Sequence, residues 1–238
     1  MDALHYLKEC LSTNDEIESF LLHPSENITG VYTFNQTQGR GQYGNQWTIA
    51  PNLNIAFSVA INSAQIHLRD SFFNYYTANS IRDFLANLTD NEVKTKWPND
   101  LILGNKKIGG ILIEKRKVHG EWYYIIGLGL NVLQESFPEV TNAGSLLTQT
   151  GQEFDLHTIT EQLFNFLQQR YKTTPSETEI IEQYNRHLYR KNVISVFEKE
   201  GKKQNGIIQK ADENGDLWID LEDDGLQKFY HKEIKLLY

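Results

Sequence analysis

The first residues suited to chemistry form a glycine-rich segment, Gly39-Arg40-Gly41-Gln42-Tyr43-Gly44. Its spacing matches G-x-G-x-x-G, which binds dinucleotides when it follows a strand and opens a helix. Here Pro51 and a further strand follow instead, and the next acidic residue is Asp70. No G-x-x-x-x-G-K-[ST] pattern occurs, so a P-loop is also excluded. The segment predicts either a plain surface turn or a flexible loop whose arginine clamps a carboxylate or phosphate.

A second candidate is a lysine-rich stretch at residues 94–117, which holds seven basic and two acidic side chains. The chain as a whole is acidic, with 23 Lys+Arg against 31 Asp+Glu and a net charge of −8. Arg40 lies in another stretch, residues 27–69, that has no acidic residue. An acidic protein with two basic stretches is expected to hold a small anion in a pocket. A solvated hairpin turn explains residues 115–117 equally well, but not Lys107 among its glycines.

The composition excludes several classes of protein. The chain has 238 residues, of which 39% are hydrophobic and 23% charged, as in ordinary globular proteins. Its single cysteine, Cys10, cannot form an internal disulfide, and no zinc-finger spacing is present, so a cytoplasmic setting is expected. We find no signal-peptide pattern and no apolar run near the roughly 18 residues of a membrane span. The net charge disfavours non-specific binding to nucleic acid.

These candidate residues are expected to be positioned by a mixed α+β domain. Apolar spacing predicts a core helix over residues 70–89. Thr13 and Glu16 match a capping box that opens a helix reaching about His23. Strands are predicted at residues 28–35, 53–61, 92–97, 107–115 and 121–131, with a turn near His119 and Gly120. Further amphipathic helices are predicted at residues 155–171 and 176–189.

The C-terminal part of the chain changes to short strands. Four are predicted, at residues 193–197, 206–211, 216–222 and 226–230. Asn214 and Gly215 give a two-residue hairpin signal between the middle two. Short strands with glycines between them suggest a small closed β-barrel. We therefore expect a domain boundary near Arg190, which divides a catalytic-sized domain at residues 1–189 from a barrel at residues 190–238.

Several motifs follow one another along the chain. The longest is Lys96-Trp97-Pro98-Asn99-Asp100, followed by Lys107-Ile108-Gly109-Gly110-Ile111-Leu112-Ile113-Glu114. Around it lie Ser12-Thr13-Asn14, Gln36, Gly39-Arg40-Gly41 and Gly127-Leu128-Gly129-Leu130-Asn131. Over nearly the whole chain this order resembles the biotin–protein ligases, of the short kind without a DNA-binding domain. The KWPND and K-x-G-G-I-L-x-E stretches are specific, whereas S-T-N alone would be weak.

The resemblance implies a catalytic domain like that of class II aminoacyl-tRNA synthetases, with a mixed sheet and flanking helices, and a C-terminal SH3-like β-barrel. It also implies a reaction that uses ATP and Mg²⁺ in two steps. First, the biotin carboxylate attacks the α-phosphate of ATP, which gives biotinyl-5′-adenylate and pyrophosphate. Then the ε-amine of a lysine on a biotin carboxyl carrier domain, of acetyl-CoA carboxylase or a related carboxylase, forms an amide and releases AMP.

The same resemblance implies roles for single residues. Lys107 is the candidate catalytic cation at the biotin carboxylate and α-phosphate, and Arg40 the one on a loop that closes over the adenylate. Ser12, Thr13 and Gln36 match positions around the ureido ring of biotin. Asp100 is also the candidate ligand of Mg²⁺. The other candidates for binding biotin or ATP are Asn14, Gly39, Gly41, Gln42, Trp47, Lys96, Trp97, Asn99, Gly109, Gly110 and Asn131.

Four of these residues have structural alternatives. Thr13 serves equally well as a helix cap. Trp47 and Trp97 are flat apolar walls of a pocket or ordinary core side chains. Asn131 ends an apolar strand, where asparagine is a common turn former.

The loop departs from the family pattern at one position. The family often has G-R-G-R, and the second arginine is Gln42 here. We therefore expect Arg40 to carry the whole cationic role of the loop.

Other functions compete with this one. Lipoate–protein ligase shares the fold and the adenylation chemistry, but KWPND and the glycine loop favour biotin. A biotin-sensing repressor needs a helix-turn-helix ahead of Ser12, where eleven residues leave no room for it. A nucleic-acid module at residues 190–238 is disfavoured by nine basic against ten acidic side chains. We expect no DNA binding and no membrane binding, and either a monomer or a homodimer.

Overall fold

The computed structural model describes residues 3–21, 28–138 and 140–238. A seven-stranded sheet has the order β1-β2-β3-β7-β6-β5-β4. Its strands are β1 (Leu4–Leu7), β2 (Thr29–Thr33), β3 (Asn54–Asn62), β4 (Val93–Lys96), β5 (Asp100–Leu103), β6 (Lys106–Val118) and β7 (Glu121–Asn131). Only β1 and β2 pair in parallel among these strands. The mixed sheet is confirmed, although β1 and β5 were not predicted.

The longest hairpin of the sheet joins β6 to β7. Its turn has positive φ at both central residues, 49° at His119 and 92° at Gly120. This backbone matches the twist of the flanking strands, which is why two-residue hairpins favour it. The predicted turn is therefore confirmed, and it aligns β6 with β7 from Val118 and Glu121 to Gly109 and Leu130.

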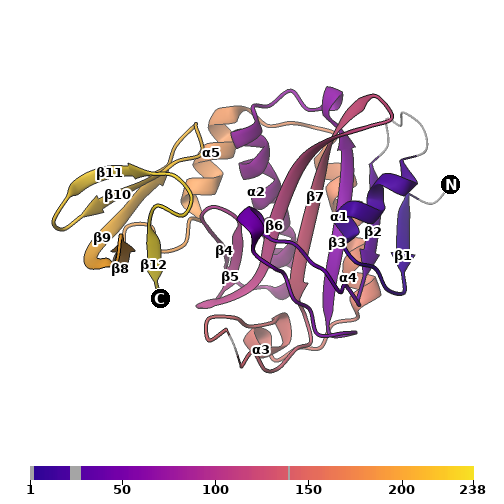
Figure 1. Ribbon diagram of the computed structural model, residues 1–238, viewed down its shortest axis with the longest axis horizontal. Helices are drawn as coiled ribbons and strands as arrows, with labels where there is room; N and C mark the ends of the chain where they lie inside the picture. The colour runs from indigo at the N-terminus through magenta and orange to yellow at the C-terminus, as the bar shows by residue number, and fades with distance from the viewer. Residues whose placement is uncertain (1–2, 22–27, 139) are drawn as a thin grey trace.

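Helices cover both faces of the sheet (Figure 1). α2 (Asp70–Thr89), α4 (Leu156–Arg170) and α5 (Glu177–Arg186) lie on one face, and the short α1 (Thr13–Glu16) lies on the other. α3 (Leu146–Thr150) was not predicted. α5 ends earlier than expected because the next residues pair with β4, where Thr95 N donates to His187 O and Tyr189 N donates to Thr95 O. No helix in the described ranges is long and apolar enough to cross a membrane.

The predicted capping box at the first helix is wrong. The N-cap is Ser12, and no side chain of the described residues caps the helix. The Thr13 hydroxyl donates instead to Gln36 Oε1, 3.2 Å away. Four α-helical residues are followed by a 3₁₀ turn, Ile17–Phe20, and the predicted end near His23 lies outside the described residues.

A second sheet is fully antiparallel and has the order β11-β10-β9-β8-β12. Its strands are β8 (Ile194–Lys199), β9 (Lys202–Ala211), β10 (Leu217–Leu221), β11 (Gly225–Phe229) and the unpredicted β12 (Lys235–Leu237). β11 and β12 are the two edge strands of this sheet, so backbone hydrogen bonds do not close it into the predicted barrel. Five residues, 212–216, connect β9 to β10 instead of the predicted two-residue turn.

The second sheet packs at the end of the molecule opposite β1 (Figure 1). Its inward side chains, among them Phe197, Ile208 and Leu217, belong to the same apolar cluster as Tyr184 and the helices of the first sheet. The two sheets therefore share one continuous core. The division at residue 190 stays a prediction.

Candidate active site

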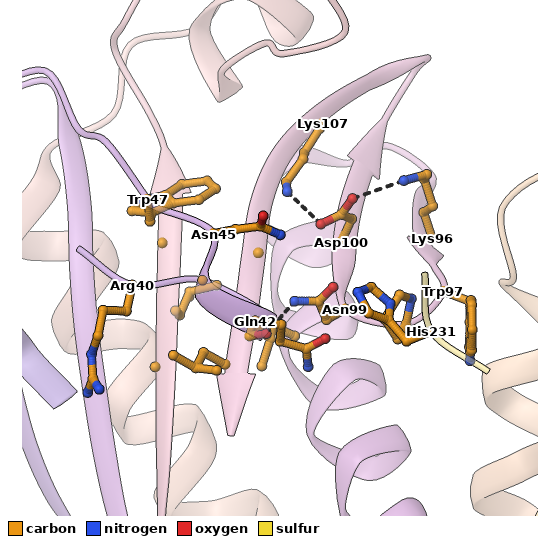
Figure 2. A pocket seen from close by; sticks show the side chains of 18 of the residues that line it. Arg40, Gln42, Asn45, Trp47, Lys96, Trp97, Asn99, Asp100, Lys107 and His231 are labelled. Atoms are coloured by element: carbon orange, nitrogen blue, oxygen red, sulfur yellow. Dashed lines mark hydrogen bonds and ion pairs between the residues drawn. The ribbon is translucent and has the colours of Figure 1, made fainter. Parts of the chain in front are cut away.

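A cavity of about 640 Å³ lies where the two sheets meet, a size within the range of small-molecule sites. The first sheet contributes the glycine loop (residues 39–47), the connection from β4 to β5, and the facing surfaces of β6 and β7 (Figure 2). The C-terminal part of the chain contributes Tyr189, Phe197, Ile208, Leu217, His231, Lys232, Ile234, Lys235, Leu236 and Tyr238. None of the residues of this second wall was among the predicted site residues.

One region of the cavity is polar and buried. We call Ser12, Thr13, Asn14 and Gln36 the polar corner; the first three side chains are 3–4% exposed. Gln36 Oε1 accepts from the Thr13 backbone N–H at 2.8 Å. Asn14 Nδ2 donates to Glu114 Oε2 at 2.7 Å. The structure therefore brings these four predicted residues together, and their contact with biotin stays a prediction.

Ser58 supports the polar corner from behind and was not predicted. This fully buried residue of β3 donates to Asn14 Oδ1 at 2.6 Å and lies 2.7 Å from the Thr13 hydroxyl. Buried polar groups need such partners to offset desolvation. Eight of the nine residues of β3 are buried, and nothing distinguishes this serine from a tolerated small residue, so no local signal predicted it.

A second region carries charge. We call Lys96, Asp100 and Lys107 the lysine–aspartate triad. Lys107 Nζ lies 2.6 Å from Asp100 Oδ1, and Lys96 Nζ lies 3.1 Å from Asp100 Oδ2 (Figure 2). Two cations against one carboxylate leave a net positive charge beside the cavity. Such a charge suits an anionic ligand.

The triad does not fit a protein-built magnesium site. Both carboxylate oxygens of Asp100 already face ammonium groups, which compete with a cation. No cluster of three or more His, Cys, Asp or Glu able to hold a metal occurs in the described ranges. Magnesium in nucleotide sites is held largely by phosphates and water, but this chain's residues offer no centre for it. The predicted role of Asp100 as a metal ligand therefore has no support in the geometry.

Trp47 connects the charged region to β7. A Cβ added at Gly129 would lie 2.1 Å from Trp47 Cε2, so the indole lies directly against the glycine. Trp47 Nε1 is buried without a partner in the structure. Lys107 Nζ lies 5.5 Å from the centre of the Trp47 ring, within cation–π range. Gly127, two residues earlier on the same face of β7, leaves similar room for Asn14 Oδ1.

Trp97 also lines the cavity but is anchored to the other sheet. Its Nε1 donates to Gly215 O at 2.9 Å. Asn99 lines the cavity and uses its amide to hold β6, with Nδ2 donating to Ile111 O at 2.8 Å. These two contacts fix the shape of the β4–β5 connection.

Arg40 points away from the triad (Figure 2). Its Nη2 lies 2.7 Å from Asp15 Oδ1 and 3.2 Å from Glu114 Oε2. Arg116 shares both carboxylates, at 2.9 and 2.7 Å. The guanidinium is therefore held at the rim in an ion-pair network, and its predicted contact with a bound adenylate stays a prediction.

Three predicted binding residues lie outside the cavity lining. A Cβ at Gly39 would come 2.2 Å from Trp47 O, and one at Gly109 would come 2.9 Å from Gly129 O. Asn131 Nδ2 donates to Gly144 O at 2.9 Å. Gly144 N in turn donates to the backbone carbonyl of Lys107 at 2.9 Å. These residues shape the site from behind. The cavity lining includes Gly41, Gln42 and Gly110 as predicted, and adds Asn45, Gln46, Gly127, Leu128 and Gly129.

Comparison with known proteins agrees with this geometry. The model of the biotin/lipoate A/B protein ligase family matches residues 9–131. A biotin–[acetyl-CoA-carboxylase] ligase of Mycobacterium tuberculosis is 26% identical over 203 residues, which cover 82% of this chain and 75% of that protein. The bifunctional ligase/repressor BirA of Escherichia coli is 30% identical over 135 residues, which cover 56% of this chain and 42% of that protein.

Solved structures share the fold. The biotin protein ligase from Aquifex aeolicus, in complex with biotin and ATP, superimposes with a TM-score of 0.78 at 23% identity. The match covers 100% of this chain and 99% of that one. Both sheets are therefore part of the shared architecture.

Proposed function

We propose that this chain, which belongs to the biotin/lipoate A/B protein ligase family, is a biotin–protein ligase. It activates biotin with ATP as biotinyl-5′-adenylate and transfers the biotinyl group to a lysine of a carrier domain. The observation that carries this proposal is the pairing, in one cavity, of a buried polar corner with a cationic triad.

The polar corner favours biotin over lipoate. The ureido ring of biotin has two N–H donors and a carbonyl acceptor, whereas the dithiolane ring of lipoate has neither. Thr13, Asn14 and Gln36 offer hydroxyl and amide groups in a buried site. These groups have partners within the site, and the donors and acceptors they still offer can bond a ureido ring but find no partner on a dithiolane.

The triad suits the first step. The biotin carboxylate forms a bond to the α-phosphorus as the bond to pyrophosphate breaks, and this brings two anions together. Lys107 offsets their repulsion and the charge that develops at phosphorus, because preorganised cations stabilise such transition states. Asp100 orients Lys107 at 2.6 Å before the substrates arrive. Trp47 and the glycines of β7 form the apolar floor beside it.

In the second step the lysine amine of the carrier attacks the mixed anhydride, an amide forms, AMP leaves and the amine proton is lost to AMP or water. Closure of the glycine loop over the cavity keeps water from the anhydride. Mg²⁺ accompanies ATP and neutralises phosphate charge when bound. The described residues hold no group of three or more His, Cys, Asp or Glu that could form its site.

Further features complete the proposal. The acceptor is a biotin carboxyl carrier domain, the setting is cytoplasmic, and the protein is a monomer or homodimer that does not bind DNA. The chain spans less than half of the bifunctional ligase/repressor it matches.

Burial raises the pKa of the Cys10 thiol to about 12, which leaves it protonated and unsuited to act as a nucleophile at neutral pH.

Pyrophosphate exchange decides between the two acids. We expect the chain to exchange labelled pyrophosphate into ATP with biotin and not with lipoate, and then to transfer labelled biotin to a carrier domain. Exchange that depended on lipoate would contradict the proposal, and so would exchange without transfer. A gel shift at physiological salt tests the absence of DNA binding.

A further inference from the structure

We propose that His231 and Lys232, in the connection between β11 and β12, are positioning residues that clasp the glycine loop over the cavity. The clasp joins them to Tyr43 in the loop. Its consequence for catalysis rests on the proposed function, because the ligand retained under the loop is the adenylate.

Tyr43 is held in an unusual conformation. Its backbone has φ 56° and ψ 39°, in the left-handed region, inside the short turn Gln42–Gly44. Non-glycine residues rarely adopt this region, and strain of this kind is kept only where other contacts enforce it. Tyr43 is 65% exposed, so burial in a core does not enforce it.

Contacts from the second sheet do. The rings of Tyr43 and His231 stack with their centres 4.4 Å apart and planes 17° from parallel. Lys232 Nζ donates to Tyr43 O at 3.0 Å and lies 5.4 Å from the centre of its ring. One residue of the loop is thus bound through its ring and its carbonyl by two neighbours, far away in the chain.

The connection that carries the clasp is itself well held. Tyr230 N donates to Glu233 Oε2 at 2.8 Å, and Glu233 N donates to Tyr230 O at 3.2 Å. His231 also lies near Trp97, with ring centres 6.0 Å apart (Figure 2). His231 therefore neighbours both a loop residue and a residue of the β4–β5 connection, as part of the cavity wall.

The loop is anchored on its other side by the first sheet. Arg40 pairs with Asp15 and Glu114, three positions before Tyr43. Release of a bound ligand through the loop must break one of these two attachments. The stacked pair and the lysine contact therefore slow the loss of the adenylate. The second sheet thus helps to retain the adenylate by holding the glycine loop.

The test compares single substitutions in the full-length chain. His231→Ala and Tyr43→Ala are each expected to release bound biotinyl-adenylate about three- to tenfold faster, as loss of an aromatic pair predicts. The double variant should release it no faster than either single variant. His231→Phe, which keeps a ring, should restore slow release, a rescue that a role for the imidazole nitrogens does not predict.

A second measurement needs no substrate. Trypsin cleavage after Arg40 in the free protein should be faster in His231→Ala and in Lys232→Met. Tyr230→Ala is the matched control, since it removes a ring of similar exposure (56%) from the same connection. The Tyr230 ring contacts the ammonium group of Lys228, which is not part of the clasp.

The outcomes separate the two proposals. Wild-type rates of cleavage and release in His231→Ala would overturn the clasp. So would equal acceleration by Tyr230→Ala. If wild-type protein fails to exchange pyrophosphate with biotin, the proposed function is wrong, and the cleavage rates alone then decide the clasp.

Discussion

The polar corner and the clasp are two halves of one cavity built in opposite ways. Three of the four residues of the polar corner, Ser12, Thr13 and Asn14, are 3–4% exposed, and the corner has partners on β3 and the segment after β2. The clasp joins a 65% exposed tyrosine to a connection in another sheet. Buried networks are rigid and costly to disturb, whereas exposed contacts open at little cost. The half that we propose to recognise biotin is therefore prebuilt, and the half that we propose to close over it is separable.

The largest effect is expected between these halves, at the triad. Lys107→Ala should lower biotin-dependent pyrophosphate exchange by about 10²–10³-fold, because it removes the cation aimed at the reacting anions. The control is Lys106→Ala, since the Lys106 ammonium donates to Thr141 O at 2.7 Å and lies outside the cavity lining. Equal losses in the two variants would contradict the assignment.

A methyl group at Gly129 should damage the prebuilt half. Its Cβ would lie 2.1 Å from the Trp47 indole, so the ring must move. We expect Gly129→Ala to destabilise the protein by about 1–3 kcal/mol and to weaken biotin binding about tenfold, as seen by denaturant unfolding and calorimetry. Gly110→Ala is the stability control, because its Cβ has 3.5 Å of room. A Gly129→Ala protein as stable as wild type would show that Trp47 is not held there.

Ser58→Ala separates binding from stability. It leaves Asn14 Oδ1 without its buried donor, which should cost about 1–2 kcal/mol of unfolding free energy and weaken biotin binding. Ser80→Ala is a matched buried serine, whose hydroxyl donates to Tyr76 O within α2. It should lose stability and keep its affinity. Loss of affinity in both variants would show that the polar corner is not specific.

The smallest effect is on stability in mild acid. Burial lowers the pKa of His187 and of His231 below the ordinary 6.5. The positive charge of Arg82 lowers the pKa of His187 further, and that of Lys232 lowers the pKa of His231 further. The unfolded chain then binds protons more readily, so stability falls as the pH drops below about 6.5. We expect Tm to fall by about 1–3 °C from pH 7.5 to 5.5. A His187→Gln/His231→Gln variant should show a flatter profile, and an unchanged one would contradict this origin.

The titration of carboxylates does not contribute to the change in stability between pH 7.5 and 5.5. Hydrogen bonds from Thr158, Arg69 and Ser176 lower the pKa of Asp155, Glu177 and Glu179 respectively. Their contribution to stability is lost only as the pH falls below about 4.5, their ordinary range. The histidine effect is therefore measured above it.

Much of the fold could be predicted from local pattern. The periodicity of α2 and the turn at His119 and Gly120 depend on near neighbours, and both are confirmed. The short strands β1, β5 and β12 have three or four residues each, too few for a clear periodicity, although β4, of the same length, was predicted. The capping box was wrong because Gln36 takes the Thr13 hydroxyl that the helix end would use.

The sequence by itself determined which residues to propose for the chemistry, because the motifs that hold Lys96, Asp100 and Lys107 are specific, and these motifs also single out the weaker S-T-N and Gln36 of the polar corner. Only the tertiary structure decided what those groups face. It turned Arg40 onto Asp15, and it brought Lys232 to Tyr43, 189 positions away. Such contacts depend on how two sheets pack on a shared core. The spacing of residues along the chain does not identify a partner so distant. A hydrophobic pattern predicts that a side chain is buried, but it does not predict which residue packs against that side chain.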